Sequence, residues 1–124
     1  MTNAEAQVFA ESWIGAWNDR DVEAVLALFA EGAEFTSPKA AALMGKAAVH
    51  APHELAEYWY GALRRVGSIR FTLNRVVNDA PARRVTIVYV SEIDGKKTRA
   101  GEFFEFDESG KVVRGEAMYG AAVE

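Results

Sequence analysis

The spacing of apolar residues changes once along this chain, at Gly67, from a helical period to a period of two. Before Gly67, apolar residues recur at steps of three and four, which is typical of helices that bury one face. After it, Ile69, Phe71 and Leu73 alternate with polar residues, which is typical of a half-buried strand. Helices followed by strands predict an α+β fold, with the helices on one face of a mainly antiparallel sheet.

Two helices are expected near the start of the chain. Thr2 and Glu5 have the spacing of a capping box, and an apolar stripe then continues to about Asn18. Asp21 can cap a second, shorter helix over residues 22–29. These two segments account for the first quarter of the chain.

The next segment is expected to be a strand, a loop and a third helix. Gly32 is a plausible helix stop, and residues 33–36 read as a short strand. Residues 38–51 are rich in alanine and are interpreted as a mobile loop. Pro52 then suits the first turn of a helix that closes at Gly67.

The second half predicts four strands joined by tight turns. Asp94-Gly95 is a strong hairpin signal between two of them. The strands are expected from residue 69, over residues 84–93, over residues 99–106 and over residues 112–119.

Length and composition restrict the classes of protein that the chain can belong to. Its 124 residues predict one domain, residues 1–124, and its net charge of −4 argues against nucleic-acid binding. There is no cysteine, no signal peptide is expected at the start, and no apolar run is long enough to span a membrane. We therefore expect a cytoplasmic protein that contacts neither membrane nor nucleic acid.

The strand over residues 85–90 is apolar on both faces, which a strand covered on one side only does not need. One face can cover the helices, while Val88 and Val90 would otherwise meet water. Such a patch usually marks a partner surface, so we expect a homodimer through the sheet. The alternative is a strand that the C-terminal tail of the same chain covers.

Two groups of short motifs carry a resemblance to a known superfamily. They are Trp13–Asn18, Asp21, Leu28–Ala30 and Phe35–Pro38 in the first half, and Gly95–Thr98, Phe103–Phe106, Gly110–Val113 and Tyr119-Gly120 in the second. Together they resemble the SnoaL-like and ketosteroid isomerase-like group of the nuclear-transport-factor-2-like superfamily, over nearly the whole chain.

This resemblance implies a cone-shaped α+β barrel, with three N-terminal helices packed into a strongly curved sheet around a deep apolar cavity. It also implies homodimers through the sheet. The implied activities act on small hydrophobic carbonyl compounds and include double-bond isomerisation, polyketide cyclisation, dehydration and epoxide opening.

The residues at the catalytic positions of the isomerases are only partly kept. The isomerase base, an aspartate before a proline, corresponds to Ser37, and a serine hydroxyl is a poor base near neutral pH. The oxyanion-holding tyrosine corresponds to Trp13, which can donate a hydrogen bond but cannot shuttle a proton. A protonated aspartate on a late strand corresponds to Glu102, which keeps the carboxyl group.

Glu102 is the candidate catalytic residue. Strand alternation places it on one face with Phe104 and Phe106, where burial would raise its pKa and favour the neutral form. A neutral Glu102 could donate a hydrogen bond to a ligand carbonyl. The alternative is an ion pair with Arg99 or with an arginine on a neighbouring strand.

The candidate ligand-binding residues are mostly aromatic. They are Trp13, Trp17, Ser37, Tyr58, Trp59, Tyr89, Phe104 and Tyr119. The alternative is that the aromatic side chains fill a core and that Ser37 only ends a strand. His50 and His53 lack a third ligand at a convincing spacing, so we expect no metal, and we expect no cofactor. A role for these histidines in a lid over the pocket, or a plain solvated helix start, stays open.

Two functions fit these residues. One is a small isomerase, cyclase or dehydratase that acts on an apolar carbonyl compound through Glu102 but lacks the usual isomerase base. The other is a non-catalytic protein that holds a small hydrophobic ligand or only supports a dimer.

Overall fold

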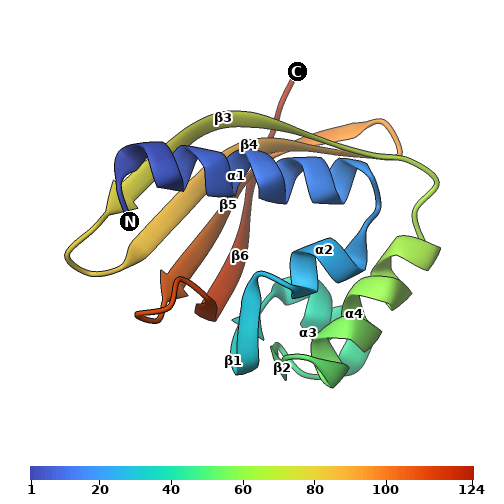
Figure 1. Ribbon diagram of the computed structural model, residues 1–124. Coiled ribbons are helices and arrows are strands. Elements are labelled where there is room, and N and C mark those ends of the chain that lie inside the picture. Colours follow the sequence, from blue (N-terminus) through green and yellow to red (C-terminus); the bar gives the residue numbers. More distant parts are fainter.

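The computed structural model describes residues 1–124 and has four helices on one face of a curved, six-stranded sheet (Figure 1). The helices are α1 (Asn3–Asn18), α2 (Val22–Leu26), α3 (Pro38–Met44) and α4 (His53–Arg64). The strands are β1 (Phe29–Thr36), β2 (Ala48–His50), β3 (Ile69–Asp79), β4 (Arg84–Ile93), β5 (Lys96–Phe106) and β6 (Val112–Ala122). The α+β class is confirmed, whereas the expected count of three helices was wrong by one.

The sheet is open, with the strand order β2-β1-β6-β5-β4-β3. All neighbouring strands are antiparallel except β1 and β6, which are parallel. The register of β3 on β4 shifts between Leu73 and Arg75, and that of β5 on β6 between Thr98 and Ala100. Such bulges bend strands, so the sheet curves strongly without closing into the expected barrel.

Strand β1 begins four residues earlier than the sequence predicted. Phe29 is buried and opens the strand, because the carbonyl of Leu28 already accepts the Val112 N–H at 2.9 Å. Gly32 does not stop a helix; it lies inside β1 at a φ of +80°. The register of β1 on β6 shifts between Phe29 and Glu34, and glycine supplies the left-handed conformation there.

The segment over residues 38–51 is not the expected mobile loop but contains α3 and β2. Ser37 caps α3, where its Oγ accepts the Lys39 N–H at 3.1 Å and Pro38 occupies the first turn. Gly45 ends the helix with a φ of +78°, and β2 then pairs antiparallel with β1. The alanines that suggested a loop are good helix formers once the helix is capped.

The other elements follow the predicted pattern, with longer strands. Thr2 and Glu5 form the capping box of α1, and the Asp21 side chain caps α2. Asp94 and Gly95 have φ values of +51° and +83° and make the predicted hairpin turn between β4 and β5. β3 begins at the predicted residue 69, whereas β5 and β6 each extend three residues beyond the predicted range, because cross-strand pairing continues where the alternation of apolar residues fades.

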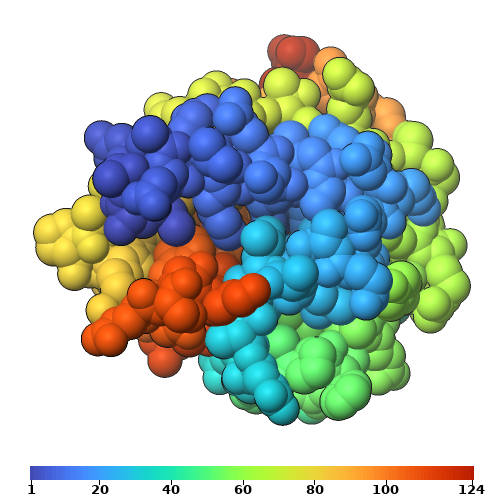
Figure 2. Space-filling view, in the orientation of Figure 1, coloured from blue at the N-terminus to red at the C-terminus, as the bar shows by residue number.

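The core lies between α1 and the inner face of the sheet. Phe9 packs edge-on against Phe104 and Phe106, with centroids 5.1 and 4.9 Å apart. Trp17 of α1 meets Trp59 of α4 at 5.3 Å. Figure 2 shows this side with α1 and α2 (blue) covering the sheet beside the β5–β6 turn (orange).

The C-terminal end of α1 is fixed to the edge strand β3. The Asn18 side chain accepts the Phe71 N–H at 2.7 Å and donates to the Phe71 carbonyl at 2.9 Å. These two hydrogen bonds hold the C-terminal end of α1 over β3. The helix and the strand thereby form two walls of the same cavity. None of the four helices has both the length and the hydropathy that crossing a membrane requires.

Candidate functional site

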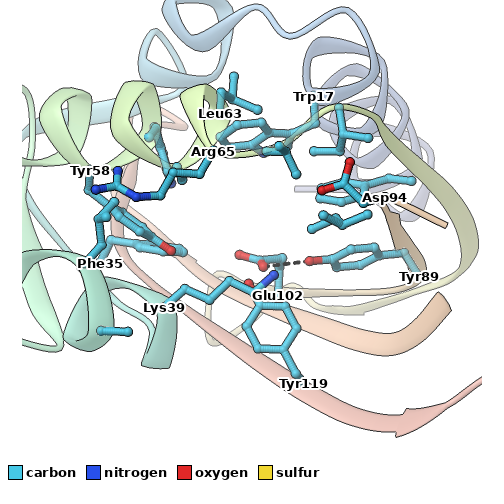
Figure 3. Close-up of a pocket in the computed structure, with 18 of the residues that line it drawn as sticks. Trp17, Phe35, Lys39, Tyr58, Leu63, Arg65, Tyr89, Asp94, Glu102 and Tyr119 are labelled. Carbon is cyan, nitrogen blue, oxygen red and sulfur yellow. Dashed lines mark hydrogen bonds between the residues drawn. The ribbon is translucent and has the colours of Figure 1, made fainter. Parts of the chain in front are cut away.

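A cavity of about 470 Å³ lies among α1, α3, α4 and the inner face of the sheet (Figure 3). Nineteen residues line it and fifteen of them are hydrophobic, so its walls suit an apolar ligand. The other four are ionisable: Lys39, Arg65, Asp94 and Glu102. These four side chains limit the chemistry that the cavity can perform.

The cavity has an exposed end and a buried end. Arg65 and Asp94 are exposed, and the Asp94 carboxylate accepts the N–H groups of Gly67 and Ser68 at 2.8 and 2.9 Å. These bonds tie the β4–β5 turn to the loop after α4. Glu102, by contrast, is only 4% exposed and lies in the buried part of the cavity.

Glu102 lies on the inner face of β5, as the alternation of the strand predicted. The Tyr89 hydroxyl on β4 donates to its Oε1 at 2.9 Å. Arg99 is exposed on the opposite face of β5, so the ion pair considered from the sequence is not formed.

The protonation state of Glu102 follows from its burial. Desolvation raises the pKa of Glu102 from 4.5 to about 8, and the Tyr89 hydrogen bond and the Lys39 charge oppose this rise less strongly. The carboxyl group is therefore mostly neutral at pH 7. The Tyr89 hydroxyl contacts Oε1, and Oε2 makes no hydrogen bond within the chain.

Two more tyrosine hydroxyls belong to the cavity, from Tyr58 of α4 and Tyr119 of β6. Burial raises the pKa of Tyr58 to about 12, and burial together with the nearby Glu102 also raises the pKa of Tyr119. Both phenols therefore stay protonated near neutral pH. They can donate hydrogen bonds to a ligand but cannot act as bases there.

Ser37 does not line the cavity. Its side chain is fully buried, and its Oγ lies 3.0 Å from the Tyr58 hydroxyl while it caps α3. Ser37 therefore holds Tyr58 and the start of α3 in place. Since its hydroxyl is already used in both contacts, it offers no free base at the position of the isomerase aspartate.

Lys39 reaches the cavity from the first turn of α3, and the sequence analysis missed it. The residue is exposed overall, yet its Nζ lies 4.3 Å from the centre of the Tyr119 ring, a cation–π contact. Desolvation lowers the pKa of Lys39, and the charge of Glu102 partly opposes this. Figure 3 shows the amine pointing toward Glu102.

Most of the residues predicted to form the site come together around this cavity. Those that line it are Trp13, Trp17, Tyr58, Trp59, Tyr89, Glu102 and Tyr119. Phe104 lies in the core instead, edge-on to Phe9 at 5.1 Å and to Trp13 at 5.9 Å. The aromatic side chains thus surround a space as well as packing with one another, and their contact with a ligand stays a prediction.

Among the four ionisable lining residues, the sequence did not suggest Lys39, Arg65 or Asp94 as part of the site. Arg65 follows the end of α4 and Asp94 belongs to a hairpin turn, so no local pattern marks either as part of a site. For Lys39 the sequence held one indication. The preceding Ser37-Pro38 can begin a helix as well as end a strand, and a helix that starts there carries Lys39 in its first turn.

His50 lies outside the cavity lining, on the short edge strand β2. Its ring nitrogens lie 3.6 Å from the Glu34 carboxylate and 3.4 Å from that of Glu54, and all three residues face the surface. His53 begins α4 and is exposed. Neither histidine is placed to cover a ligand, because each belongs to a regular element.

Comparisons with known proteins agree with this architecture. The family model of the SnoaL-like domain matches residues 10–115. A SnoaL-like protein of unknown function from Burkholderia thailandensis is 30% identical, with 97% of this chain and 98% of that chain covered and a TM-score of 0.87. No curated protein is similar to the chain in sequence at a significant level.

Two more distant structures share the fold. A nuclear-transport-factor-2-like protein of unknown function from Burkholderia pseudomallei is 18% identical, with 96% and 92% of the two chains covered and a TM-score of 0.78. A protein with a ketosteroid isomerase-like fold from Catenulispora acidiphila is 15% identical, with 89% and 83% covered and a TM-score of 0.70. The family model and the 30% identical relative show that this chain belongs to the SnoaL-like family.

Proposed function

We propose that this protein binds a small hydrophobic carbonyl compound in the cavity, with Glu102 donating a hydrogen bond to the carbonyl oxygen. The observation that carries this proposal is a buried, neutral carboxyl at the inner end of an apolar cavity, fixed by Tyr89. An apolar ligand that fills the cavity would displace water from this carboxyl, which strengthens the hydrogen bond that Glu102 donates.

The same contact would support isomerisation, cyclisation or dehydration of the ligand. Each of these reactions can proceed through an enol or enolate, and a donor on the carbonyl oxygen stabilises the charge that develops there. A carboxyl whose pKa is about 8 can also exchange its proton near neutral pH. We propose an enzyme of this class, in which Glu102 is the acid.

A non-catalytic binding protein is the second candidate, and Ser37 favours it. The reactions above also need a base at the carbon, and the Ser37 hydroxyl is held by Tyr58 and by the first turn of α3. Trp13, at the position of the isomerase tyrosine, can donate a hydrogen bond but cannot transfer a proton at neutral pH.

Replacing Glu102 with leucine tests the proposed contact. We expect wild-type protein to bind the neutral ketone 2-acetonaphthone, and Glu102→Leu to weaken binding by about tenfold, the loss expected for one buried hydrogen bond. Isothermal titration calorimetry measures the affinity. The matched control is Glu105→Leu, because Glu105 lies on the other face of the same strand and pairs with Arg84 and Arg114.

Equal affinities of wild-type protein and Glu102→Leu would contradict the proposed contact, and absence of binding would contradict the function itself. Turnover separates the two candidates. Conversion of 3-cyclohexenone to its conjugated isomer, followed by absorbance and lost in Glu102→Gln, would identify the enzyme. Binding of the ketone without any conversion would favour the non-catalytic protein for this reaction class.

We also propose that the protein forms a homodimer through the outer face of the sheet. Three exposed apolar side chains on β3, β5 and β6 support this: Val77 (53% exposed), Phe103 (41%) and Met118 (51%). Val88 and Val90 of β4 share the face and are half-buried. An apolar surface of this kind on one side of a sheet suits a second copy of the same surface.

Replacing Phe103 with aspartate is expected to convert the dimer into a monomer, because each interface would then bury two carboxylates. Sedimentation velocity at micromolar concentrations measures the mass of the particle. Val8→Asp is the control, since Val8 is 62% exposed but lies on α1, away from the sheet face. A wild-type monomer, or a dimer that Phe103→Asp leaves intact, would argue against this interface.

A further inference from the structure

Lys39 is a cation of the cavity that has no carboxylate partner within 4 Å. Lys46 and Lys97, by contrast, pair with Glu54 and Glu92 at the surface. The only specific contact of the Lys39 amine is the face of the Tyr119 ring, 4.3 Å from its centre. Although Lys39 is exposed overall, its amine lies against the Tyr119 ring and is partly desolvated, so an anionic ligand group beside it would stabilise its charge.

The acidic groups of the cavity do not supply that counter-ion. The Asp94 carboxylate is held at the exposed end by the N–H groups of Gly67 and Ser68. Glu102 lies near Lys39, but its burial keeps it mostly neutral at pH 7. With Glu102 neutral, Lys39 supplies the positive charge beside it, whereas the other cation of the lining, Arg65, is exposed and donates to the Gly61 carbonyl at 3.0 Å.

The two groups are arranged to hold one acidic ligand group together. Figure 3 shows Lys39 from α3 and Glu102 from β5 approaching the same open space, beside the Tyr119 ring. A carboxylate placed there can accept a hydrogen bond from the Glu102 hydroxyl on one oxygen and pair with the Lys39 ammonium on the other. Charge-assisted contacts of this kind are roughly twice as strong as neutral hydrogen bonds.

We propose that the ligand is an anion, namely an apolar ring compound with one carboxylate that Lys39 and Glu102 bind together at the inner end of the cavity. This inference rests on the proposed function, because it needs an apolar compound whose oxygen atom accepts a hydrogen bond from Glu102. It adds that Lys39 selects a charged ligand over a neutral one of the same shape.

The test compares two probes of nearly equal shape, 2-naphthoate and 2-acetonaphthone, which differ in charge at the group that would reach Glu102. At pH 7 we expect wild-type protein to bind 2-naphthoate about tenfold more tightly than the ketone, by calorimetry. Lys39→Met keeps roughly the length of the side chain and removes the charge, so it should abolish this preference by weakening the binding of 2-naphthoate about tenfold. Lys46→Met, which alters a surface lysine, should keep the preference.

Two results would overturn this inference and leave the proposed function intact. The first is a wild-type protein that binds the ketone and binds 2-naphthoate no more tightly. The second is a preference for 2-naphthoate that persists in Lys39→Met. If neither probe binds, the proposed function fails and the inference fails with it. Thermal unfolding of each variant confirms that the fold is intact before the affinities are compared.

The pH dependence of 2-naphthoate binding gives a second test. The groups that face Glu102 are Tyr89 of β4, Tyr58 of α4, Tyr119 of β6 and Lys39 of α3, and the three tyrosines stay neutral below pH 10. Affinity should therefore fall as the pH rises through about 8, where Glu102 ionises and repels the anion. In Glu102→Gln this fall should be absent, and a wild-type affinity constant from pH 6 to 9 would overturn the joint role of Glu102.

Discussion

Glu102→Gln is expected to be more stable than wild-type protein at pH 9, by on the order of 5 kcal/mol at most, and nearly equal to it at pH 4. The reason is the shift of the Glu102 pKa from 4.5 in the unfolded chain to about 8 in the native protein. Between these two values the native state holds a proton that the unfolded state has released. The free energy of unfolding of the wild type therefore falls as the pH rises, by about 1.4 kcal/mol for each pH unit.

Glutamine removes this dependence and keeps the geometry. Its amide oxygen can accept the Tyr89 hydroxyl as Glu102 Oε1 does, and its NH₂ group can donate into the cavity as the neutral carboxyl does. It cannot transfer a proton. Glu102→Gln should therefore lose any acid catalysis while it keeps affinity for a neutral ketone, which is why leucine is the better variant for testing the hydrogen bond.

Urea unfolding of wild-type protein and Glu102→Gln at several pH values between 4 and 9 measures this effect. The difference between the two proteins cancels the groups that titrate alike in both, whereas Lys39 contributes through the charge of Glu102, which acts on its pKa. Glu105→Gln is the matched control, because Glu105 lies on the outer face of β5 in surface ion pairs. Parallel stability curves for wild-type protein and Glu102→Gln would mean that Glu102 ionises normally, and the chemistry proposed for the cavity would fail with it.

The sequence predicted the position of Glu102 because strand alternation is a local property. Residues 102, 104 and 106 share a face whatever the rest of the chain does, and a carboxyl among phenylalanines is conspicuous. The sequence did not indicate that Tyr89 is the hydrogen-bond partner of Glu102. Tyr89 lies on another strand, and the pairing of Ile87 with Glu102 that brings the two together depends on the register between β4 and β5.

Lys39 could not be placed from the sequence for a different reason. The segment that carries it was interpreted as a loop, and in a loop the direction of a side chain is not defined. Once Ser37 caps α3, the first turn of the helix directs Lys39 toward the cavity. The charge pattern of the site thus depends on one helix of seven residues, which is too short to show a clear period.

The same contrast holds for the fold. The helices α1 and α4 and the hairpin at Asp94 follow from local spacing and turn chemistry, and their prediction was correct in kind. Strand β1 was predicted too short, because its partners β2 and β6 lie on either side of it in space but elsewhere in sequence. The pairing of β1 with β6 joins segments about eighty residues apart, and no local pattern near Phe29 encodes it.

At Gly115 the backbone of β6 lies very close to the Phe35 side chain of β1. Gly115 lies on β6 opposite Phe35 of β1 and Phe104 of β5, with a backbone conformation that any residue can adopt. A Cβ added to Gly115 would lie 2.9 Å from Cδ1 of the Phe35 ring, closer than side chains tolerate. That ring is 4% exposed and packs against Tyr58 and Trp59, so it has little room to move.

Replacing Gly115 with valine is therefore expected to reduce the free energy of unfolding by about 3 kcal/mol, at the upper end of overpacking in a core. Urea unfolding measures it, with Gly101→Val as the control, because a Cβ at Gly101 on the neighbouring strand meets only Phe103 at an ordinary 3.6 Å. Since Phe35 lines the cavity, a displaced ring would also narrow it, and affinity for 2-acetonaphthone should fall in parallel with stability. Equal stabilities of the two valine variants would show that the Phe35 ring can move at little cost, and that its position is not fixed by its contact with Gly115.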